Sequence, residues 1–568
     1  MHGGPNFSAS VLLQEAQLRP LTRSLDPGLD GGDAVTIAGL FRSDAPARDK
    51  AKTIIRKLAE RLFATHDWPD ALPGNPALVA GTHAIDENPW IPSGYTYLLQ
   101  LIAHDMVDTI AIADGTDLKL QNGRLRPLLL DTLYGLGPMA SAAPYQLDDA
   151  QKGSAGLVPR GRLRMGRIQQ DGHVDGCPFR DIGRATTTAT TDTAHPMITD
   201  KRWTEALIAD PRNDDHALIS QMTALWHVVH NLVIADIEQQ CSTEEIENPE
   251  HSYRRFLMAR HAVTAIYHAI IETDVLVRIL HPDVYRRYAR DNAPLLGAAG
   301  DAVPRIFSHG AFRFGHAMTR DNYVVNDKAP AGQEMARAFS LSSRHSPTRL
   351  PMTPEWVVDW DLFFEGGTQR PNLTHRIGPH YPRVFDHTGL FFISPEGGKG
   401  LAERDLVSAA LAELPKVSTL YGDLMTRAGL AAASPSFADV VAPMDAWLMS
   451  KVPDAGERAI IAADPPLAFF VLFEAGLAPS NGRHLGPFGS IIIAEALFRP
   501  LRAFKSKLGG AATLKQRIAA GNGLLPGKPD ALKLLTGAAV PEIDTMPKLI
   551  AFVKSHDGFP PVVQSNHG

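Results

Sequence analysis

The sequence predicts a mainly α-helical protein, built as one large helical unit with long loops and little β-structure. Apolar residues recur at helical spacing in many segments, whereas runs that alternate apolar and polar residues are scarce. The 43 prolines and 47 glycines fall mostly in connecting segments, which indicates long loops between the helices. The sequence shows no internal repeat and no Gly/Ser linker, so we expect one unit rather than a string of modules.

Residues 216–240 carry the clearest helical pattern, with Leu218, Met222 and Leu225 on one apolar stripe. Carboxylates stand directly before this segment and favour a helix N-terminus there. The stretch 95–112 is strongly apolar and long enough for a buried helix. Further helices are expected at residues 50–65, 252–280, 305–320, 401–428, 490–505, 513–520 and 546–554.

Composition narrows the class of protein. The chain has 568 residues, and 44% of them are hydrophobic, so it can bury a large core. Its 56 basic and 62 acidic residues give a net charge of -6, which argues against a nucleic-acid partner. Cys177 and Cys241 are the only cysteines and provide no disulfide framework. We see neither a secretory signal nor an apolar run near the roughly 20 residues of a membrane span, so we expect a cytoplasmic protein, with signal-independent secretion as the alternative.

Gln100 and His104, in the fragment QLIAHD, lie four residues apart on the apolar stretch, so both side chains project from one helix face. A neutral histidine in a dry pocket can accept a proton from a bound peroxide and return it to the leaving oxygen. Gln100 can hold a water molecule or an anion beside it. The alternative is a core histidine that is satisfied by a hydrogen bond.

Two more fragments extend this hypothesis. DPRNDD places Arg212 directly before the clearest helix, where a guanidinium can stabilise negative charge on a peroxide oxygen; the alternative is a surface arginine. FRFGH places Arg313 one turn before His316, so that His316 could hold a haem iron and Arg313 could meet a haem propionate. Gly315 removes a side chain where a flat macrocycle needs room. The alternative for this last fragment is a packed helix with a polar face.

Four other histidines, His227, His230, His261 and His268, lie on predicted helices and are interpreted as packing residues. His227 and His230 have a spacing that could suit a metal. No acidic or Cys partner stands near them in the sequence, so we do not expect a zinc site.

A series of motifs follows in order along residues 80 to 505: YLLQLIAHDMVD, YGLGP (134–138), GRLRMGR (161–167), IADPRNDDHALISQMTALWHVVHN (208–231), FRFGHAMTRDNY (312–323), DWDLFF (359–364) and LGPFGSIIIAEAL (485–497). In this order they resemble the animal-type haem peroxidase superfamily (myeloperoxidase- and cyclooxygenase-like), in particular its bacterial branch. We therefore expect an N-terminal arm and helix on the core (1–80), a haem peroxidase catalytic domain (81–510) and a C-terminal helical tail (511–568).

The resemblance implies a role for each candidate site residue. His104 is similar to the distal acid–base, Gln100 to its neighbour that contacts halide or water, and Arg212 to the distal arginine. His316 is similar to the proximal iron ligand and Arg313 to the propionate contact. The implied enzyme is a haem peroxidase, which cleaves hydrogen peroxide through a ferryl intermediate and is then reduced by a halide, thiocyanate, a phenol or a metabolite.

The resemblance also bears on how the haem is attached. Mammalian members carry an esterified Asp directly before the distal histidine, where this chain has Ala103. A second ester comes from a Glu three residues after the distal arginine, where this chain has Asp215, one methylene shorter. His216 follows in place of the Met that forms a sulfonium link. We therefore expect haem b that is mostly or wholly non-covalent.

Two further features of the family are only partly matched. Asp105 corresponds to the first calcium ligand, but the partner loop has Leu129 where a carboxylate is usual and keeps only Asp131. Asp105 and Asp131 are thus the candidate calcium ligands. The family's acceptor for the proximal histidine is an Asn or Gln after an LP dipeptide, and LPKVS offers Ser418 to His316 as a weaker partner.

Other functions of the same superfamily remain as alternatives. Fatty-acid dioxygenases and cyclooxygenases use a Tyr three residues before the proximal histidine, and this chain has Arg313 there, so we rank that activity second. A haem-binding adhesive protein without catalysis would not need both His104 and Arg212. A biosynthetic enzyme for one metabolite is a further alternative.

Overall fold

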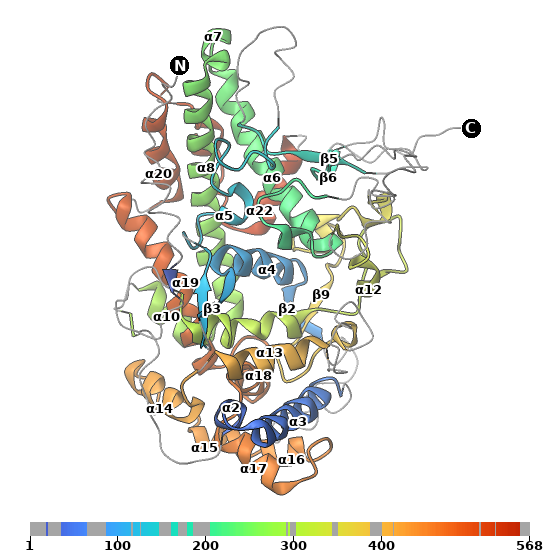
Figure 1. Cartoon of the computed structure of the whole chain (residues 1–568). Coiled ribbons are helices and arrows are strands. Elements are labelled where there is room, and N and C mark those ends of the chain that lie inside the picture. The colour runs from blue at the N-terminus through green and yellow to red at the C-terminus, as the bar shows by residue number, and fades with distance from the viewer. Residues whose placement is uncertain are drawn as a thin grey trace, which may run out of the picture.

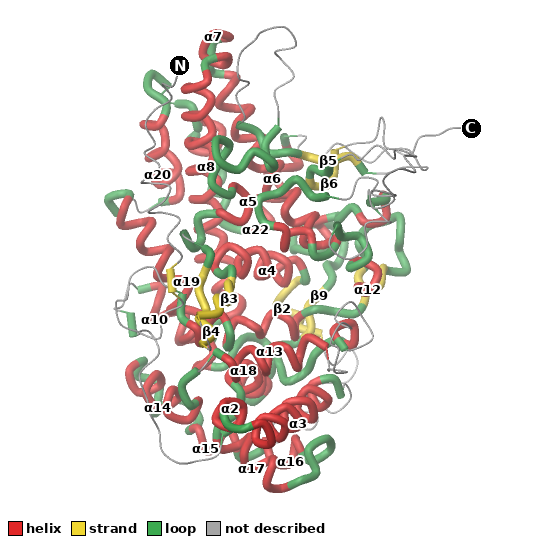
Figure 2. The backbone as a smooth tube through the Cα atoms, in the orientation of Figure 1, coloured by secondary structure: helices red, strands yellow, loops and turns green. Residues whose placement is uncertain are grey.

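The computed structural model describes residues 19–20, 36–64, 87–114, 117–124, 126–146, 161–168, 179–185, 205–290, 294–295, 303–343, 350, 352–386, 400–412, 414–510, 513–528 and 530–556. Within these residues helices dominate and strands form only small sheets, which confirms the predicted fold class (Figure 2). Buried apolar residues from Ile37 to Val553 along the sequence form one hydrophobic cluster, which is the main core. Cys177 and most of the expected N-terminal arm lie outside the described residues.

The core is organised around three long helices (Figure 1): α4 (Gly94–Met106), α6 (Ala217–Gln239) and α8 (Pro249–Ile270). Helix α6 packs against both α4 and α8, and the predicted stripe residues Leu218, Met222 and Leu225 are buried. The segment predicted as one helix over 252–280 is α8, a π-turn (Ile271–Val275) and α9 (Leu276–Ile279).

The helix predicted over 95–112 is wrong in its last third, residues 107–112. Helix α4 ends at Met106, Val107 is extended, and Thr109–Asp114 form strand β3, which pairs with β4 (Asp117–Asn122). The side-chain amide of Asn122 donates to the Met106 carbonyl at 3.0 Å, so the hairpin caps the end of the helix. The β-branched residues of β3 favour a strand once this cap is in place.

Two other predicted helices are interrupted. The segment 305–320 is α11 (Arg305–Ser308) followed by a 3₁₀ helix, η6 (Ala311–Met318). Between them, the backbone of Gly310 leaves helical geometry (φ -127°, ψ -98°). A side chain would not fit there, because an added Cβ would lie 2.4 Å from the Leu467 side chain. The segment 401–428 divides at Pro415 into α13 (Gly400–Leu411) and α14 (Val417–Arg427), because proline cannot donate a helical hydrogen bond.

Four predicted helices are confirmed with small changes in their ends: α3 (Ala45–Leu62), α19 (Pro487–Lys507), α20 (Leu514–Ala519) and α22 (Met546–Ser555). Helix α3 buries Ile54, Leu58 and Leu62 and packs with α2 (Ile37–Arg42) against α13 (Figure 1). The remaining helical segments are α5 (Asp131–Tyr134), η4 (Pro211–Asp214), α7 (Thr243–Glu247), α10 (Pro282–Ala289), α12 (Met335–Ala338), η8 (Pro354–Trp356), η9 (Trp360–Leu362), η10 (Arg383–Phe385), α15 (Phe437–Val441), α16 (Met444–Leu448), α17 (Ala455–Ala463), α18 (Leu467–Gly476), η12 (Ala520–Leu524) and α21 (Lys533–Thr536).

The sheets are small and antiparallel. A short strand β1 (Arg19–Pro20) joins the β3–β4 hairpin on the side of β4. The other pairs are β2 (Glu87–Pro92) with β9 (Leu373–His375), β5 (Met165–Arg167) with β6 (Phe179–Ile182), and β7 (Asn322–Tyr323) with β8 (Gln333–Glu334).

Helix α6 is the one helix of the described part that is long and apolar enough to cross a membrane by length and composition; a second candidate arises only if the bent pair α17 and α18 is counted as one span. In the most apolar 18-residue stretch of α6, 89% is buried inside the protein. Its apolar surface therefore packs against protein, as expected for a core helix.

Candidate active site

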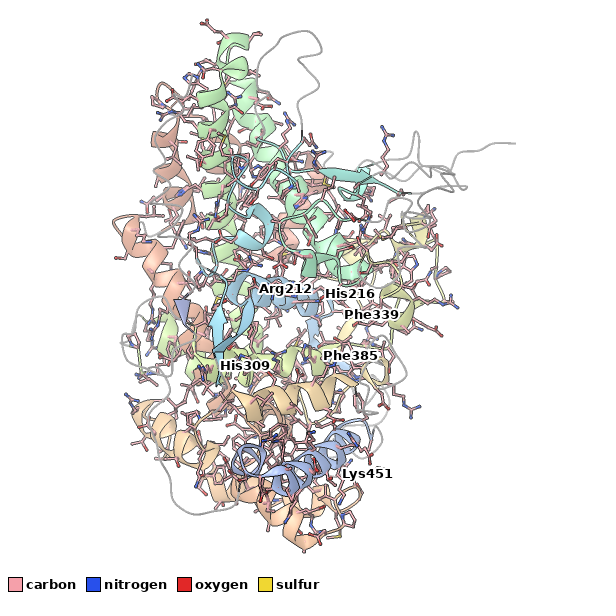
Figure 3. The ribbon with its side chains drawn as sticks, viewed as in Figure 1. Arg212, His216, His309, Phe339, Phe385 and Lys451 are labelled. Carbon is pink, nitrogen blue, oxygen red and sulfur yellow. The ribbon has the colours of Figure 1, made fainter. Side chains whose placement is uncertain are left out.

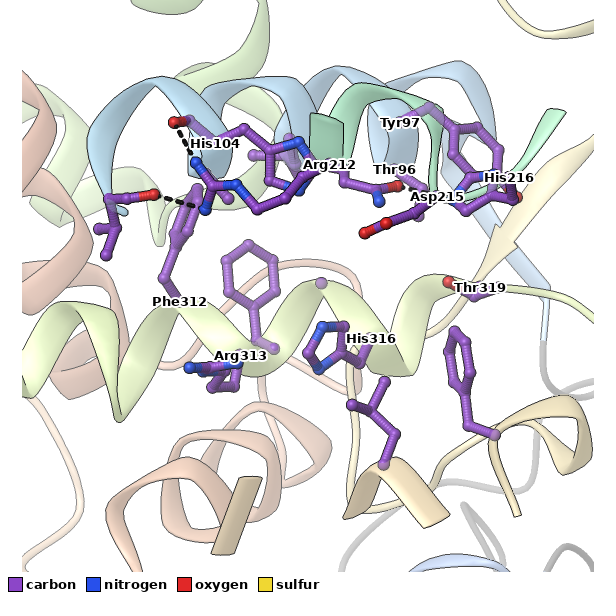
Figure 4. A pocket seen from close by; sticks show the side chains of 18 of the residues that line it. Thr96, Tyr97, His104, Arg212, Asp215, His216, Phe312, Arg313, His316 and Thr319 are labelled. Carbon is purple, nitrogen blue, oxygen red and sulfur yellow. Dashed lines mark hydrogen bonds between the residues drawn. The ribbon is translucent and has the colours of Figure 1, made fainter. Parts of the chain in front are cut away.

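A cavity of about 460 Å³ lies in the middle of the molecule, lined by α4, η4 and η6. Figure 4 shows its two walls, with His104, Arg212 and His216 on one and Arg313 and His316 on the other. The apolar part of the lining comprises Leu99, Ala103, Val107, Phe312, Phe314, Met335, Phe339, Phe385 and Leu401. Figure 3 places Arg212, His216, Phe339 and Phe385 together in this central region.

The cavity brings together predicted site residues from separate segments of the chain. Its lining includes Gln100, His104, Arg212, Asp215, Arg313 and His316. The lining does not include Asp105, Asp131 or Ser418. The two walls therefore carry the residues predicted to act on peroxide and the residue predicted to hold iron, facing the same space.

His104 is held in one orientation by an amide that the sequence did not reveal. Its Nδ1 lies 2.8 Å from Oδ1 of Asn213. The Nδ2 group of Asn213 donates to the carbonyl and hydroxyl oxygens of Thr132 at 3.1 and 3.0 Å, which leaves Oδ1 as the end that faces His104. Nδ1 of His104 therefore carries the proton, and Nε2 is the basic nitrogen. Asn213 directly follows Arg212 in sequence, which is the one signal that could have found it.

Arg212 reaches the cavity from η4 but is largely engaged by protein. Its Nε and Nη2 groups donate to Asp210, its Nη2 also donates to the His104 carbonyl at 2.9 Å, and its Nη1 donates to the Val107 carbonyl at 2.7 Å. A guanidinium has five N–H groups, so one N–H of Nη1 is left for the cavity among the described contacts. Burial lowers the pKa of Arg212, and the charges of Asp108 and Asp215 oppose that shift. The side chain stays a cation at neutral pH.

A second arginine supports the same wall. Arg124 donates from Nε to the His104 carbonyl at 2.6 Å and forms an ion pair with Asp210 through Nη2. Burial and the charge of Arg212 lower the pKa of Arg124. The two cations thus share Asp210 and bind backbone carbonyls at the C-terminal end of α4, where the helix dipole favours positive charge. Arg124 lies between two of the motifs and in neither, so the sequence analysis did not single it out.

Gln100 is oriented by His216, which caps α6. His216 Nδ1 accepts the backbone N–H of Ile219 at 3.3 Å, and its Nε2 lies 3.0 Å from Oε1 of Gln100. Since Nδ1 accepts, Nε2–H donates, and the amide NH₂ of Gln100 is the end of that side chain that remains a donor. Asp215 also lines the cavity, directly before His216.

The acceptor for His316 is Asp405, and the prediction of Ser418 is wrong. Nδ1 of His316 lies 2.6 Å from Oδ2 of Asp405, on α13. The hydroxyl of Tyr381 donates to the same oxygen at 2.8 Å. Burial would raise the pKa of Asp405, but the charges of His316 and Arg313 and the hydrogen bonds hold it below its usual value. Ser418 lies on the next helix, α14, because the chain turns at Pro415 and α13 rather than α14 reaches η6.

Arg313 lines the cavity but also serves the proximal wall. Its Nη1 lies 3.3 Å from Oδ1 of Asp405, and its Nε donates to the Ser308 carbonyl at 3.1 Å. The side chain is 31% exposed. Its predicted contact with a propionate stays a prediction, and its contacts here neutralise a buried carboxylate.

The candidate calcium ligands Asp105 and Asp131 are bound by donor groups of the protein. Asp105 accepts the backbone N–H groups of Leu130 and Thr132 at 2.9 and 3.2 Å. Asp131 is paired with Arg126 and Arg260, at 3.0 and 2.7 Å. Among the described residues no group of three or more His, Cys, Asp or Glu side chains could hold a metal ion. The guanidinium groups of Arg126 and Arg260 supply positive charge beside Asp131, as a bound cation would. The sequence motif did not reveal these ion pairs.

The four histidines interpreted as packing residues each bind a backbone carbonyl. His227 and His230 contact the carbonyls of Arg164 and Gly161, both at 2.9 Å. Burial lowers the pKa of His227 to about 4 and that of His230 to about 3, so both are neutral. His261 and His268 contact the carbonyls of Arg517 and Leu128. These contacts confirm the packing interpretation.

The cavity fits a haem group. His316 has Nδ1 engaged by Asp405, so Nε2 is the nitrogen that can bind iron, and Figure 4 shows its ring directed toward the cavity. A Cβ added at Gly315 would meet no atom within 4 Å, so open space lies beside the backbone there. Apolar side chains line much of the space, and His104 stands on the opposite wall. This donor set and lining suit an iron macrocycle with one histidine ligand.

Comparisons with known proteins give a family match over part of the chain and likenesses of the whole fold. The family described as animal haem peroxidase matches residues 151–356. Among solved structures, the chain is similar to peroxidase A from Dictyostelium discoideum (13% identity, covering 96% of this chain and 95% of that one, TM-score 0.51). It is also similar to the fatty acid alpha-dioxygenase of Oryza sativa (12% identity, covering 96% and 89%, TM-score 0.50). At these identities the structural likeness shows the fold alone. A search of curated proteins finds no match.

The fold and the family match define a haem peroxidase-type oxidoreductase. Residues 151–356 match the animal haem peroxidase family, whose members bind haem.

Proposed function

We propose that this protein is a peroxidase that uses hydrogen peroxide as its oxidant and haem b, mostly or wholly non-covalent, as its cofactor. The observation that carries the proposal is the arrangement of His104 and Arg212 on one wall of the cavity, opposite His316 on the other. A scaffold protein without catalysis would not need a base and a cation on that wall. Haem held by Nε2 of His316 would supply the iron that binds the peroxide and the two electrons that cleavage of the O–O bond consumes.

The residues of the chain move the proton. Nε2 of His104 takes the proton from one peroxide oxygen and returns it to the other, so that the second oxygen leaves as water. Asn213 keeps the ring in the tautomer that this transfer requires. The remaining N–H of Arg212 stabilises the negative charge that develops on the leaving oxygen.

The reducing substrate is a small molecule in this proposal: a halide, thiocyanate, a phenol or a metabolite. Support comes from Gln100, whose carboxamide NH₂ is kept as a donor by the contact of Oε1 with His216. A donor beside His104 suits an anion or a hydroxyl group. We further propose that Asp215 forms no haem ester, because its side chain is one methylene shorter than the glutamate of the family pattern.

The test is the absorption spectrum of the purified full-length protein, with haem added, before and after hydrogen peroxide. A haem band that changes on peroxide addition is expected for wild type. Acid–acetone extraction should release the haem. His316→Ala should weaken haem binding by at least tenfold, whereas His556→Ala, at an exposed histidine directly after α22, should leave it unchanged. Wild-type protein that takes up no haem, or haem that never reacts with peroxide, would contradict the proposal.

One observation favours a second candidate, a fatty-acid dioxygenase. Arg313 stands at the position of the radical-forming tyrosine, but Tyr97 lines the cavity from α4. The Tyr97 hydroxyl contacts the sulfur of Met335 at 3.6 Å. Oxygen uptake with a fatty acid that is lost in Tyr97→Phe would establish this activity, and its absence in wild type would leave the peroxidase proposal alone.

A further inference from the structure

The proximal wall contains a carboxylate in contact with the residue proposed to bind iron. Asp405, on α13, is buried, with 2% of its side chain exposed. Its Oδ2 atom accepts hydrogen bonds from His316 Nδ1 at 2.6 Å and from the Tyr381 hydroxyl at 2.8 Å. Its Oδ1 atom lies 3.3 Å from Nη1 of Arg313. Three donors therefore meet on one buried carboxyl group.

This arrangement is built to hold an anion. Burying a carboxylate is costly unless it is paired and hydrogen-bonded, and here Arg313 supplies the positive charge while Tyr381 supplies a second donor. The shortest of the three contacts is the one to His316. Short contacts of this kind are typical of hydrogen bonds to an ionised acceptor. The carboxylate thus interacts most strongly with the imidazole.

An anionic acceptor changes what the imidazole can do. When Nδ1–H donates to a carboxylate, the ring gains negative character and Nε2 becomes a stronger electron donor toward a metal. A neutral amide or hydroxyl in the same place would give less of this effect. Stronger donation stabilises the oxidised state of the iron relative to the reduced state.

Resting on the proposed function, we propose that Asp405 is a positioning residue that makes His316 a strongly donating iron ligand, and that Tyr381 moderates this effect. Tyr381 and His316 share Oδ2, so each hydrogen bond draws electron density from the same oxygen. Removing the carboxylate charge and removing the phenol hydroxyl therefore act in opposite directions on the iron. A carboxylate that served only to join α13 to η6 would produce no such pair of effects.

The test is the ferric/ferrous midpoint potential of the haem-loaded full-length protein, together with the iron–histidine stretching frequency of the ferrous form. Asp405→Asn should raise the potential, with on the order of a tenfold increase in the ferrous-to-ferric ratio at a fixed applied potential, and should lower the stretching frequency. Tyr381→Phe should lower the potential and raise the frequency, both by less.

Matched controls separate these effects from a loss of stability. Asp181→Asn removes another buried, ion-paired carboxylate, which binds Arg184 at 2.7 Å. Tyr145→Phe removes another buried phenol, which donates to the Tyr134 carbonyl. Both should leave the potential and the frequency unchanged.

The outcomes distinguish this inference from the proposed function. Wild-type protein that binds haem and reacts with peroxide, with an Asp405→Asn variant of unchanged potential, overturns the inference alone. If Asp405→Asn does not fold, Tyr381→Phe decides: a lowered potential supports the inference and an unchanged one overturns it. Wild-type protein that takes up no haem overturns the proposed function and the inference with it.

Discussion

The two walls of the cavity support their histidines in different ways. On the distal wall, His104 donates from Nδ1 to the neutral amide of Asn213. On the proximal wall, His316 donates from Nδ1 to the carboxylate of Asp405. In both contacts Nε2 is the nitrogen that remains toward the cavity. Only the partner of His316 carries a negative charge, which lies directly beside the imidazole. A neutral partner preserves a base that can take and release a proton, whereas a charged partner favours a ligand that stays bound to a metal.

The buried carboxylates behind the two walls also differ, because their pKa values are shifted in opposite directions. Asp105 lies behind His104, where burial and the charge of Asp131 raise its pKa to about 7. Asp405 lies behind His316, where an imidazole, a guanidinium and a phenol hold its pKa below the usual value. Both side chains are almost fully buried, so the difference between the two pKa shifts comes from their partners: those of Asp405 outweigh the effect of burial, and those of Asp105 do not.

The largest effect is expected when the distal base is removed. His104→Ala should slow the reaction with hydrogen peroxide roughly a thousandfold while the haem stays bound, because proton transfer by a positioned side chain typically contributes 10²–10⁴ in rate. Stopped-flow absorption at the haem band measures this step. The control is His556→Ala, which removes an exposed histidine. An unchanged rate in His104→Ala would show that the distal wall does not supply the base.

A smaller loss is expected from the distal cation. Arg212→Ala should slow the same step on the order of a hundredfold, since it removes a donor aimed at developing charge. Arg212→Lys should recover only part of the rate, because an ammonium cannot replace the fork that binds Asp210 and two carbonyls. Arg337→Ala, at a largely exposed arginine, is the matched control. Equal rates for Arg212→Ala and wild type would leave Arg212 with a structural role at the end of α4.

Changing the partner of the distal histidine tests the comparison directly. Asn213→Leu should slow the peroxide step about tenfold, because the tautomer of His104 is no longer fixed. Asn213→Asp would give His104 a charged partner like that of His316. A carboxylate raises the pKa of a neighbouring imidazole, so the rate should fall at neutral pH and recover as the pH rises. A rate profile with the same midpoint as wild type would mean that the partner's charge does not govern the distal base.

Sequence reasoning located the reacting groups better than their supports. Gln100, His104, Arg212 and His316 lie in short motifs whose residue types suggest a chemical role, and the structure brings them to one cavity. The residue that orients His316 does not lie in a motif whose residue types suggest a chemical role. Asp405 is 89 residues from His316 in sequence and stands in an ordinary amphipathic helix, so only the packing of α13 reveals it.

Errors in the predicted helices have similar causes. The apolar pattern of residues 95–112 continues past Met106, but the cap from Asn122 and the strand pairing of β3 come from residues farther along the chain. The break at Pro415 could have been read from the sequence, and it displaces Ser418 from the proximal wall. Periodicity predicts which segments are helical, whereas tertiary contacts decide where they stop.

The last prediction concerns the stability of the distal wall and not the rate of the reaction. Because the pKa of Asp105 is about 7 in the folded protein and about 4 in the unfolded chain, the folded state binds the extra proton between these values. The free energy of unfolding should therefore fall as pH rises from about 4 to 7, by a few kcal/mol for this group. Asp105→Asn removes the titration, so the stability of wild type relative to this variant should decline over that range.

Denaturant unfolding of both proteins at several pH values measures this difference. Asp327→Asn, at an exposed carboxylate, should show no comparable trend. A flat difference between wild type and Asp105→Asn would mean that Asp105 is already ionised at low pH, as it would be beside a bound cation. Repeating the series with a chelator then decides between a bound calcium ion and the two arginines as the source of positive charge. If calcium binds there, the pH trend should appear only after the metal is removed. If Arg126 and Arg260 supply the positive charge beside Asp131, the trend should be the same with and without the chelator.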